Sequence, residues 1–256
     1  MKNQCKPILS YPIACQEKIL SGLVVLALLA AGLLPFIAQD QAYHQFADRR
    51  IFFNVPNTLD SLSNLAFVIF GAWGLVLQWR RLLVFETGAL QQLVTLFFVG
   101  FIGTGVGSFW YHLAPDDTGL VLDRLGMVIA LSGVLGIAAA HKVSARAGYA
   151  LAALALALGP LSVWWWKQSG NVAPYAVLQF GGMLLVIWMM SLRSSVRGPN
   201  WAVFITLYAL AKVFETFDLQ VFQLTHGLIS GHTLKHLVAA CAALAIIFPK
   251  KSHKNF

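Results

Sequence analysis

Charged side chains are scarce in this 256-residue chain. Asp, Glu, Lys and Arg together make up 11% of it, only 10 residues are acidic, and 58% of the chain is hydrophobic. Soluble domains carry about 25% charged residues, so the composition excludes an ordinary soluble domain. It indicates a polytopic membrane protein in which spans of about 20 residues use nearly the whole length.

Cysteine is also rare. Cys5, Cys15 and Cys241 are an odd number without the short spacings of metal-binding motifs, which argues against a disulfide framework and a zinc–thiolate site. The net charge of +8 is compatible with a nucleic-acid partner, but the basic residues mark the ends of apolar runs and form no single patch. That distribution is a topology signal, so no nucleic-acid partner is expected.

The apolar runs predict an all-α, polytopic membrane helical bundle with eight spans. The first run resembles a signal peptide because lysines precede it, but it exceeds an h-region of 7–15 residues and no small-x-small cleavage site follows. We therefore expect a retained helix. The predicted spans are 19–38, 61–79, 89–112, 119–140, 149–166, 174–191, 201–218 and 232–248.

The basic residues orient these spans. With the N-terminus inside, the outer segments hold only Arg49, Arg50 and Lys167. Cytoplasmic loops are enriched in Lys and Arg, so both termini are predicted to be cytoplasmic. The inner segments hold Lys2, Lys6, Lys18, Arg80, Arg81, Lys142, Arg146, Arg193, Arg197, Lys250, Lys251 and Lys254.

This topology places the unusual polar residues near the outer ends of their spans. Ionisable groups at membrane depth are costly and usually face a cavity or a partner. Polar residues that only help helices to pack would be scattered along the spans. The gathering of these residues in the outer leaflet therefore indicates a functional site. The residues are Ser108, His112, Asp123, His232 and His236, with Asn57, Asp60, Asn64, Glu215 and Asp218 as candidate surrounding residues.

Three histidines at one depth predict a metal site. The segment "HTLKH" places His232 and His236 at i and i+4, on one helix face, a spacing that suits two ligands of one metal ion. A catalytic zinc commonly takes three protein ligands and keeps one position open, and His112 is the natural third ligand. Asp123 would then exchange protons with a water molecule at the metal, and Ser108 would donate to a developing oxyanion.

Taken alone, each of these residues has an ordinary structural interpretation. A single H-x3-H pair in a membrane helix is a weak signal. Ser108 could bond a carbonyl one turn back, Asp123 could pair with Arg124 or cap a helix, and Glu215 could pair with Lys212. The prediction of a site rests on their convergence at one depth.

The order S-x3-H, then Asp123 eleven residues on, then a late H-x3-H resembles the alkaline ceramidase family, and bacterial ceramidase-like membrane proteins most closely. Three stretches carry the likeness, "NTLDSLSNLAF" (57–67), "GSFWYHLAPDDTGLVLDRL" (107–125) and "SGHTLKHLVAA" (230–240). The resemblance implies a seven-helix core over residues 43–249. An additional transmembrane helix would lie within residues 1–42, and residues 250–256 would form a basic cytoplasmic tail.

The resemblance further implies that His112, His232 and His236 bind zinc, with Asp123 as the proton-transfer carboxylate and Ser108 as the oxyanion helper. The implied reaction is hydrolysis of the amide of ceramide or a related N-acyl lipid, to a fatty acid and an amine. A membrane lipid is therefore the expected partner, and no protein partner is implied. A bacterial inner-membrane location, with the site toward the periplasm, is expected.

Calcium is not expected. Eukaryotic members of the family carry an acidic calcium site before their first core helix, including a glutamate just ahead of the SN motif. Asn57 stands at that position here, and Asp40 and Asp48 are the nearby upstream acids.

Three other functions remain open at this stage. A seven-helix receptor of the same superfamily would bind a ligand without turnover. A haem-binding subunit would use His112 and His232 as axial ligands, which leaves Asp123 and Ser108 unexplained. A rhomboid-like serine protease would leave two histidines without a role.

Overall fold

The computed structural model describes residues 13–194 and 196–250, and their regular structure is helical apart from isolated bridges. The predicted all-α class is therefore confirmed. Residues 1–12, 195 and 251–256, which include Lys2, Lys6 and most of the predicted basic tail, lie outside the described residues. The helices are α1 (Ile13–Leu33), η1 (Gln41–His44), α2 (Thr58–Ser63), α3 (Leu65–Trp79), α4 (Gly88–Leu113), α5 (Asp117–Lys142), α6 (Ala145–Ser169), α7 (Ala173–Ala176), η2 (Val177–Gly181), α8 (Gly182–Met190), α9 (Trp201–Thr216), α10 (Asp218–Leu224), α11 (Gly231–Cys241) and α12 (Leu244–Ile247).

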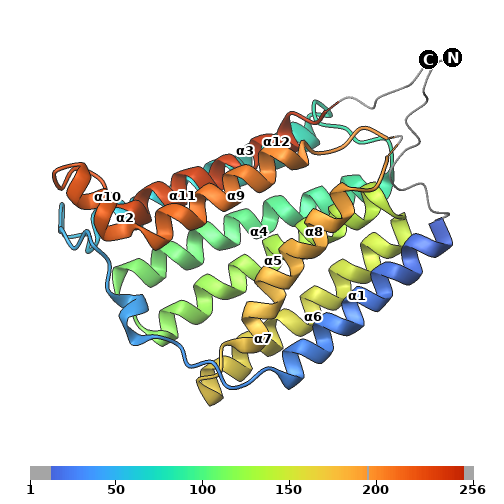
Figure 1. The fold of residues 1–256 in the computed structure, drawn as a ribbon. Helices are drawn as coiled ribbons and strands as arrows, with labels where there is room; N and C mark the ends of the chain where they lie inside the picture. Colours follow the sequence, from blue (N-terminus) through green and yellow to red (C-terminus); the bar gives the residue numbers. More distant parts are fainter. Residues whose placement is uncertain (1–12, 195, 251–256) are drawn as a thin grey trace, which may run out of the picture.

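Six helical segments of the described chain are long and apolar enough to cross a membrane, which indicates an integral membrane protein. They are α1, α2–α3, α4, α5, α6 and α7–α8, and the shorter apolar segment Gly231–Ile247 follows them. The 16-residue α9 completes the bundle. Each predicted span thus coincides with helix, and successive segments run in alternating directions (Figure 1).

Several predicted boundaries were wrong by a few residues. The first helix begins at Ile13 and ends at Leu33, two residues ahead of Pro35, because the residue before a proline is pushed out of the helical conformation. Helix α9, at the seventh predicted span, ends at Thr216. Asp218 therefore opens the short α10 and does not close the predicted span.

Helices α4 and α5 are in unusually close contact, because glycines on both of them face the other helix. A Cβ added at Gly100 would fall 2.2 Å from the backbone of Ala130, and one at Gly107 would fall 2.4 Å from the carbonyl oxygen of Leu122. Small residues of this kind let helix backbones approach closely in membranes. The contact sets α4 and α5 in fixed register near the end where Ser108 and Asp123 lie.

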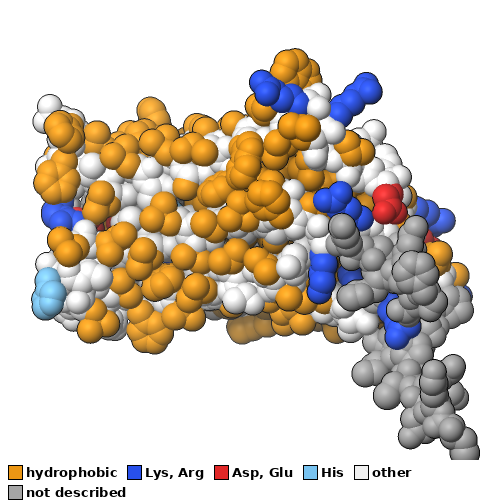
Figure 2. Space-filling model, turned by 90° about the horizontal axis from the view of Figure 1, so that it is seen from above, with side chains coloured by type: hydrophobic (Ala, Val, Ile, Leu, Met, Phe, Trp, Pro, Cys, Tyr) orange, Lys and Arg blue, Asp and Glu red, His pale blue; other side chains and the backbone are white. Residues whose placement is uncertain are grey.

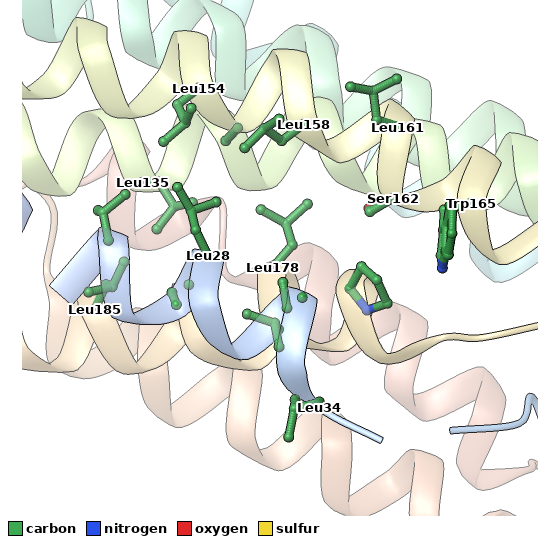
Figure 3. A pocket seen from close by; sticks show the side chains of 18 of the residues that line it. Leu28, Leu34, Leu135, Leu154, Leu158, Leu161, Ser162, Trp165, Leu178 and Leu185 are labelled. Carbon is green, nitrogen blue, oxygen red and sulfur yellow. The ribbon is translucent and has the colours of Figure 1, made fainter. Parts of the chain in front are cut away.

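Helix α1 lies at the edge of the bundle (Figure 1), where it contacts α7 and η2. Only Gln16 and Leu20 of this helix are buried. A cavity of about 680 Å³ separates its inner face from the core, lined by leucines such as Leu28, Leu158 and Leu178 (Figure 3). The described residues that line this cavity are apolar apart from a few such as Ser162 and Asn171, and none of them is ionisable.

Basic side chains gather at one end of the bundle, and the three histidines lie at the other end. A broad belt of hydrophobic side chains covers the face in Figure 2, and Lys and Arg side chains gather at one end of it. That end holds the connections after α3, α5, α8 and α12. The C-terminus of α4 and the N-terminus of α11, which carry the three predicted ligands, lie at the opposite end (Figure 1).

We predict that Gly126→Ala destabilises the bundle by about 1–3 kcal/mol, the usual cost of overpacking. The added Cβ would lie 2.5 Å from the backbone of Gly103, which cannot move without parting α4 from α5. Thermal unfolding of the protein in detergent measures the effect.

Gly103→Ala is the matched control, because its Cβ would have its nearest neighbour at an ordinary 3.6 Å. We expect this control to leave the melting temperature unchanged or slightly raised, since alanine is the better helix former. Equal melting temperatures for the two variants would contradict close packing as the cause.

Candidate metal centre

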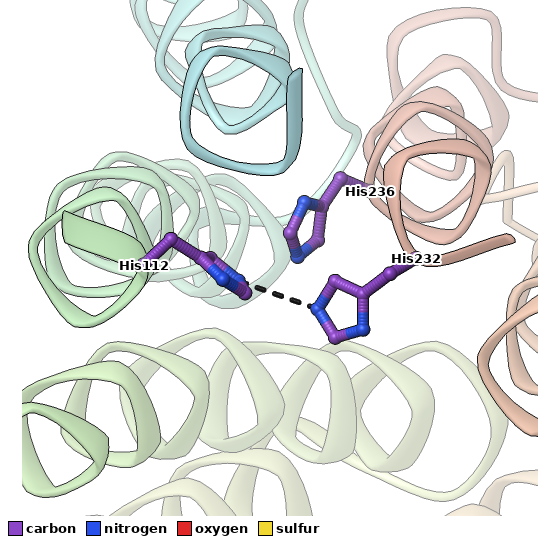
Figure 4. A group of neighbouring side chains, drawn as sticks. All are labelled: His112, His232 and His236. Carbon is purple, nitrogen blue, oxygen red and sulfur yellow. Dashed lines mark hydrogen bonds between the residues drawn. The ribbon is translucent and has the colours of Figure 1, made fainter. Parts of the chain in front are cut away.

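Three buried histidines from two helices face one another. His112 comes from the last turn of α4, and His232 and His236 come from successive turns of α11 (Figure 4). Their ligand nitrogens all lie within 4.8 Å of one another, and the Nε2 atoms of His112 and His232 are 3.3 Å apart. The group could therefore hold one metal ion.

The tautomer of His236 is set by Ser63. The Ser63 hydroxyl lies 2.9 Å from the carbonyl oxygen of Asp60 and 2.8 Å from Nδ1 of His236. A hydroxyl has a single hydrogen, and when Ser63 donates it to the carbonyl oxygen of Asp60, the Ser63 oxygen can accept from His236. In that arrangement Nδ1 of His236 donates to Ser63, and its Nε2 keeps a free lone pair.

His112 is held through its backbone. The side-chain amide of Asn57 donates to the carbonyl oxygen of His112 at 2.8 Å, where the last carbonyls of α4 have no partner within the helix. Asn57 itself has a left-handed backbone, with φ of 44°, a conformation that asparagine tolerates better than most residues. Asn57 thus joins the start of α2 to the end of α4.

Two aspartates fix the N-terminus of α11, where His232 is the second residue of the helix. Asp60 accepts hydrogen bonds from the hydroxyls of Ser230 and Thr233. Asp218 accepts from the backbone N–H of His232 at 2.7 Å, and its other carboxylate oxygen accepts from the backbone N–H of Ala47 at 2.9 Å.

Asn64, also expected around the site, donates to the carbonyl oxygen of Asp60 at 2.9 Å. Asn57, Asp60 and Asp218 therefore contact the backbones and caps of the helices that carry the three histidines, whereas the Asn64 amide bonds α2. None of these hydrogen bonds reaches an imidazole nitrogen of the three histidines.

The segment before α2 covers the histidines. The Phe46 ring lies 4.5 Å, between centroids, from the rings of both His112 and His232. His44, in the same segment, bonds the Tyr111 hydroxyl at 2.8 Å and pairs with Asp117 at 3.1 Å. These contacts close the end of the bundle over the metal-ligand group.

A second cavity, of about 390 Å³, begins at this group and extends into the bundle. Ser108 and Asp123 line its polar end and interact with each other through their side chains. Its ionisable lining also includes Arg124, Lys212, Glu215, Lys235 and His236. Its walls further in are apolar and include Phe97, Phe101, Val134, Met183 and Phe204.

Glu215 pairs with two lysines at this cavity. It pairs with Lys212 on its own helix, as its spacing suggested, and its other carboxylate oxygen is 2.9 Å from Nζ of Lys235. Lys235 Nζ is also 3.2 Å from Nε2 of His232. Lys235 therefore lies inside the site, paired with an acid.

Ser63 and Phe46 were not singled out from the sequence. Ser63 lies within "NTLDSLSNLAF", so the motif pointed to its neighbourhood, but a serine in a helix carries no signal of its partner. Phe46 lies in a segment without periodicity. Only the folded arrangement brings it against the two histidines.

Residues 51–248 match the family described as Ceramidase. No curated protein matches the chain. The matched region contains the three histidines, Ser108 and Asp123, and α1 precedes it. The match spans well over half of the sequence, and the chain therefore belongs to the ceramidase family, the family of the alkaline ceramidases.

Proposed function

We propose that this protein is a zinc-dependent intramembrane hydrolase that cleaves the amide bond of ceramide or a related N-acyl lipid. The products would be a free fatty acid and an amine. The observation that carries the proposal is the buried group of His112, His232 and His236, with ligand nitrogens within 4.8 Å of one another, in a chain of the ceramidase family.

The donor set suits zinc. Imidazole is a common zinc ligand, and three histidines are a known catalytic set. His112 Nδ1 and His236 Nε2 are buried without a hydrogen-bond partner within the described part of the chain, and buried polar atoms normally have one. The bond from His236 Nδ1 to Ser63 is the second-sphere contact that orients a ligating histidine.

Bound at these three histidines, zinc would supply Lewis acidity and lower the pKa of a water molecule toward neutrality. The chain would supply the proton transfers. Asp123 faces the same cavity as His236, where its carboxylate can take a proton from water during attack and return it to the leaving amine. Ser108, beside Asp123, can donate its hydroxyl hydrogen to the developing oxyanion.

The cavity suits a lipid chain. Phe97 and Ser108 both line it and are eleven residues apart on α4, a separation of about 16 Å along a helix. Its far walls are apolar, so an acyl chain can extend inward from an amide held at the polar end.

We further propose eight spans, with the site toward the periplasm of a bacterial inner membrane. The clustering of Lys and Arg at the opposite end of the bundle (Figure 2) supports this orientation through the positive-inside rule.

Calcium is not part of the proposal, because the nearby acids have other partners. Asp48 forms a bidentate ion pair with Arg50, in which Nε and Nη2 of the arginine lie 2.7 and 2.6 Å from the two carboxylate oxygens. This pair raises the pKa of Arg50. Asp40 accepts from the backbone N–H of Ala42, and the amide of Asn57 is bonded to His112.

Elemental analysis of the detergent-purified protein tests the metal centre. We expect about one zinc per chain in the wild type and none in His232→Ala/His236→Ala. A folded wild type that holds no zinc and takes up none when zinc is added would contradict the mechanism.

Asp123→Asn should lower kcat for fatty-acid release by about 10²–10⁴-fold, the usual contribution of a general acid–base group. Zinc content should be unchanged, because Asp123 is not among the three ligands. Asp116→Asn, at the N-cap of the same helix, is the control and should keep activity, because asparagine caps a helix as well as aspartate does. A zinc-loaded wild type that releases no fatty acid from any N-acyl lipid tested would instead favour a receptor.

Ser63→Ala should weaken zinc binding by about 10–100-fold, because it removes the contact that fixes the His236 tautomer. Competition with a chelator measures the affinity. Ser132→Ala, whose hydroxyl bonds the carbonyl oxygen of Val128 on its own helix at 2.7 Å, controls for loss of a buried hydroxyl. Equal zinc affinities in the two variants would show that Ser63 does not act on the ligand.

A further inference from the structure

Arg124 is a buried cation in the wall of the proposed catalytic cavity. It follows Asp123 on α5. Its guanidinium carbon lies 4.0 Å from the ring centroid of Trp166 and 4.7 Å from that of Tyr175. Its Nη2 donates to the side-chain oxygen of Gln39. Arginine stacks on aromatic rings in this way while keeping its charge, so the guanidinium is held in a fixed plane.

This cation has no anionic partner in the described part of the chain. Its Nη1 is buried without a hydrogen-bond partner, and the salt bridges formed by the described residues do not include it. Arginine is almost never fully buried unless it is paired. An unpartnered donor on a buried guanidinium therefore points to a ligand that completes the pair.

The two lysines of the cavity lining each contact a carboxylate. Glu215 pairs with both Lys212 and Lys235, and Asp123 interacts with Ser108. Arg124 thus remains as the cationic group of the cavity lining whose charge is not matched by a contacting carboxylate. A planar guanidinium with a free edge matches the two oxygens of a carboxylate or phosphate.

We propose that Arg124, with Gln39 beside it, forms an oxyanion-binding subsite of the cavity for a carboxylate or phosphate carried by an amphiphile. Which molecule carries this oxyanion is inferred from the proposed hydrolase function. The oxyanion is either the acidic headgroup of an N-acyl lipid substrate or the carboxylate of the released fatty acid. In the first case the enzyme prefers acidic N-acyl lipids to neutral ones such as ceramide.

Equilibrium binding of radiolabelled amphiphiles to the detergent-solubilised protein tests the subsite. The first pair is N-lauroylglycine and N-lauroylethanolamine, which differ in the carboxylate and are measured in an Asp123→Asn background to prevent cleavage. The second pair is laurate and dodecanamide, which represent the product and a neutral analogue. We expect the acidic member of at least one pair to bind about tenfold more tightly, as a charge-assisted hydrogen bond allows.

Arg124→Gln should abolish that preference, whereas Arg146→Gln, an exposed arginine at the start of α6, should retain it. If the variant loses the preference only for N-lauroylglycine over N-lauroylethanolamine, the subsite binds the substrate headgroup. If it loses the preference only for laurate over dodecanamide, the subsite binds the product. If Arg124→Gln does not fold, Arg124→Lys carries the test, because lysine keeps the charge but lacks the planar fork.

An unchanged preference in the Arg124 variant, or no preference in the wild type, would overturn the subsite. Binding is measured without turnover, so this result is separate from the hydrolase proposal. A protein that binds acidic amphiphiles through Arg124 but holds no zinc would keep the subsite and refute the proposed reaction.

Discussion

The close contact between α4 and α5 is the constraint on which the site depends. Glycines such as Gly100 and Gly126 leave no room for a Cβ between the two backbones, so one helix cannot slide along the other without collision. Ser108 and His112 lie on one of these helices and Asp123 on the other. Their fixed register places the serine, the carboxylate and one of the three histidines at the same end of the bundle.

The second half of the site is built around the N-terminus of α11. Asp60 bonds the cap residues Ser230 and Thr233, and Asp218 bonds the backbone of His232. These carboxylates hold the helix that carries two of the histidines against α2 and α10. Many of the polar residues that looked functional in the sequence thus serve to position the ligands.

Burial of charge explains the remaining polar residues. Unpaired charges at membrane depth are costly, and Glu215 accordingly pairs with both Lys212 and Lys235. Arg124 departs from this pattern, since aromatic rings and an amide surround its guanidinium and Nη1 has no hydrogen-bond partner among the described residues. The proposed anion-binding subsite follows from that departure.

The sequence by itself determined the all-α membrane class, the positions of the helices and the three histidines that the structure brings together as a group able to hold a metal ion. Hydrophobic runs, the i, i+4 spacing of His232 and His236, and the shared depth of His112 are properties of local order and span length. Only the tertiary structure decided that Ser63 orients His236, that Phe46 covers two histidines and that Arg124 lacks an acid. These are contacts between segments far apart in the chain, and they depend on side-chain directions that no local pattern specifies.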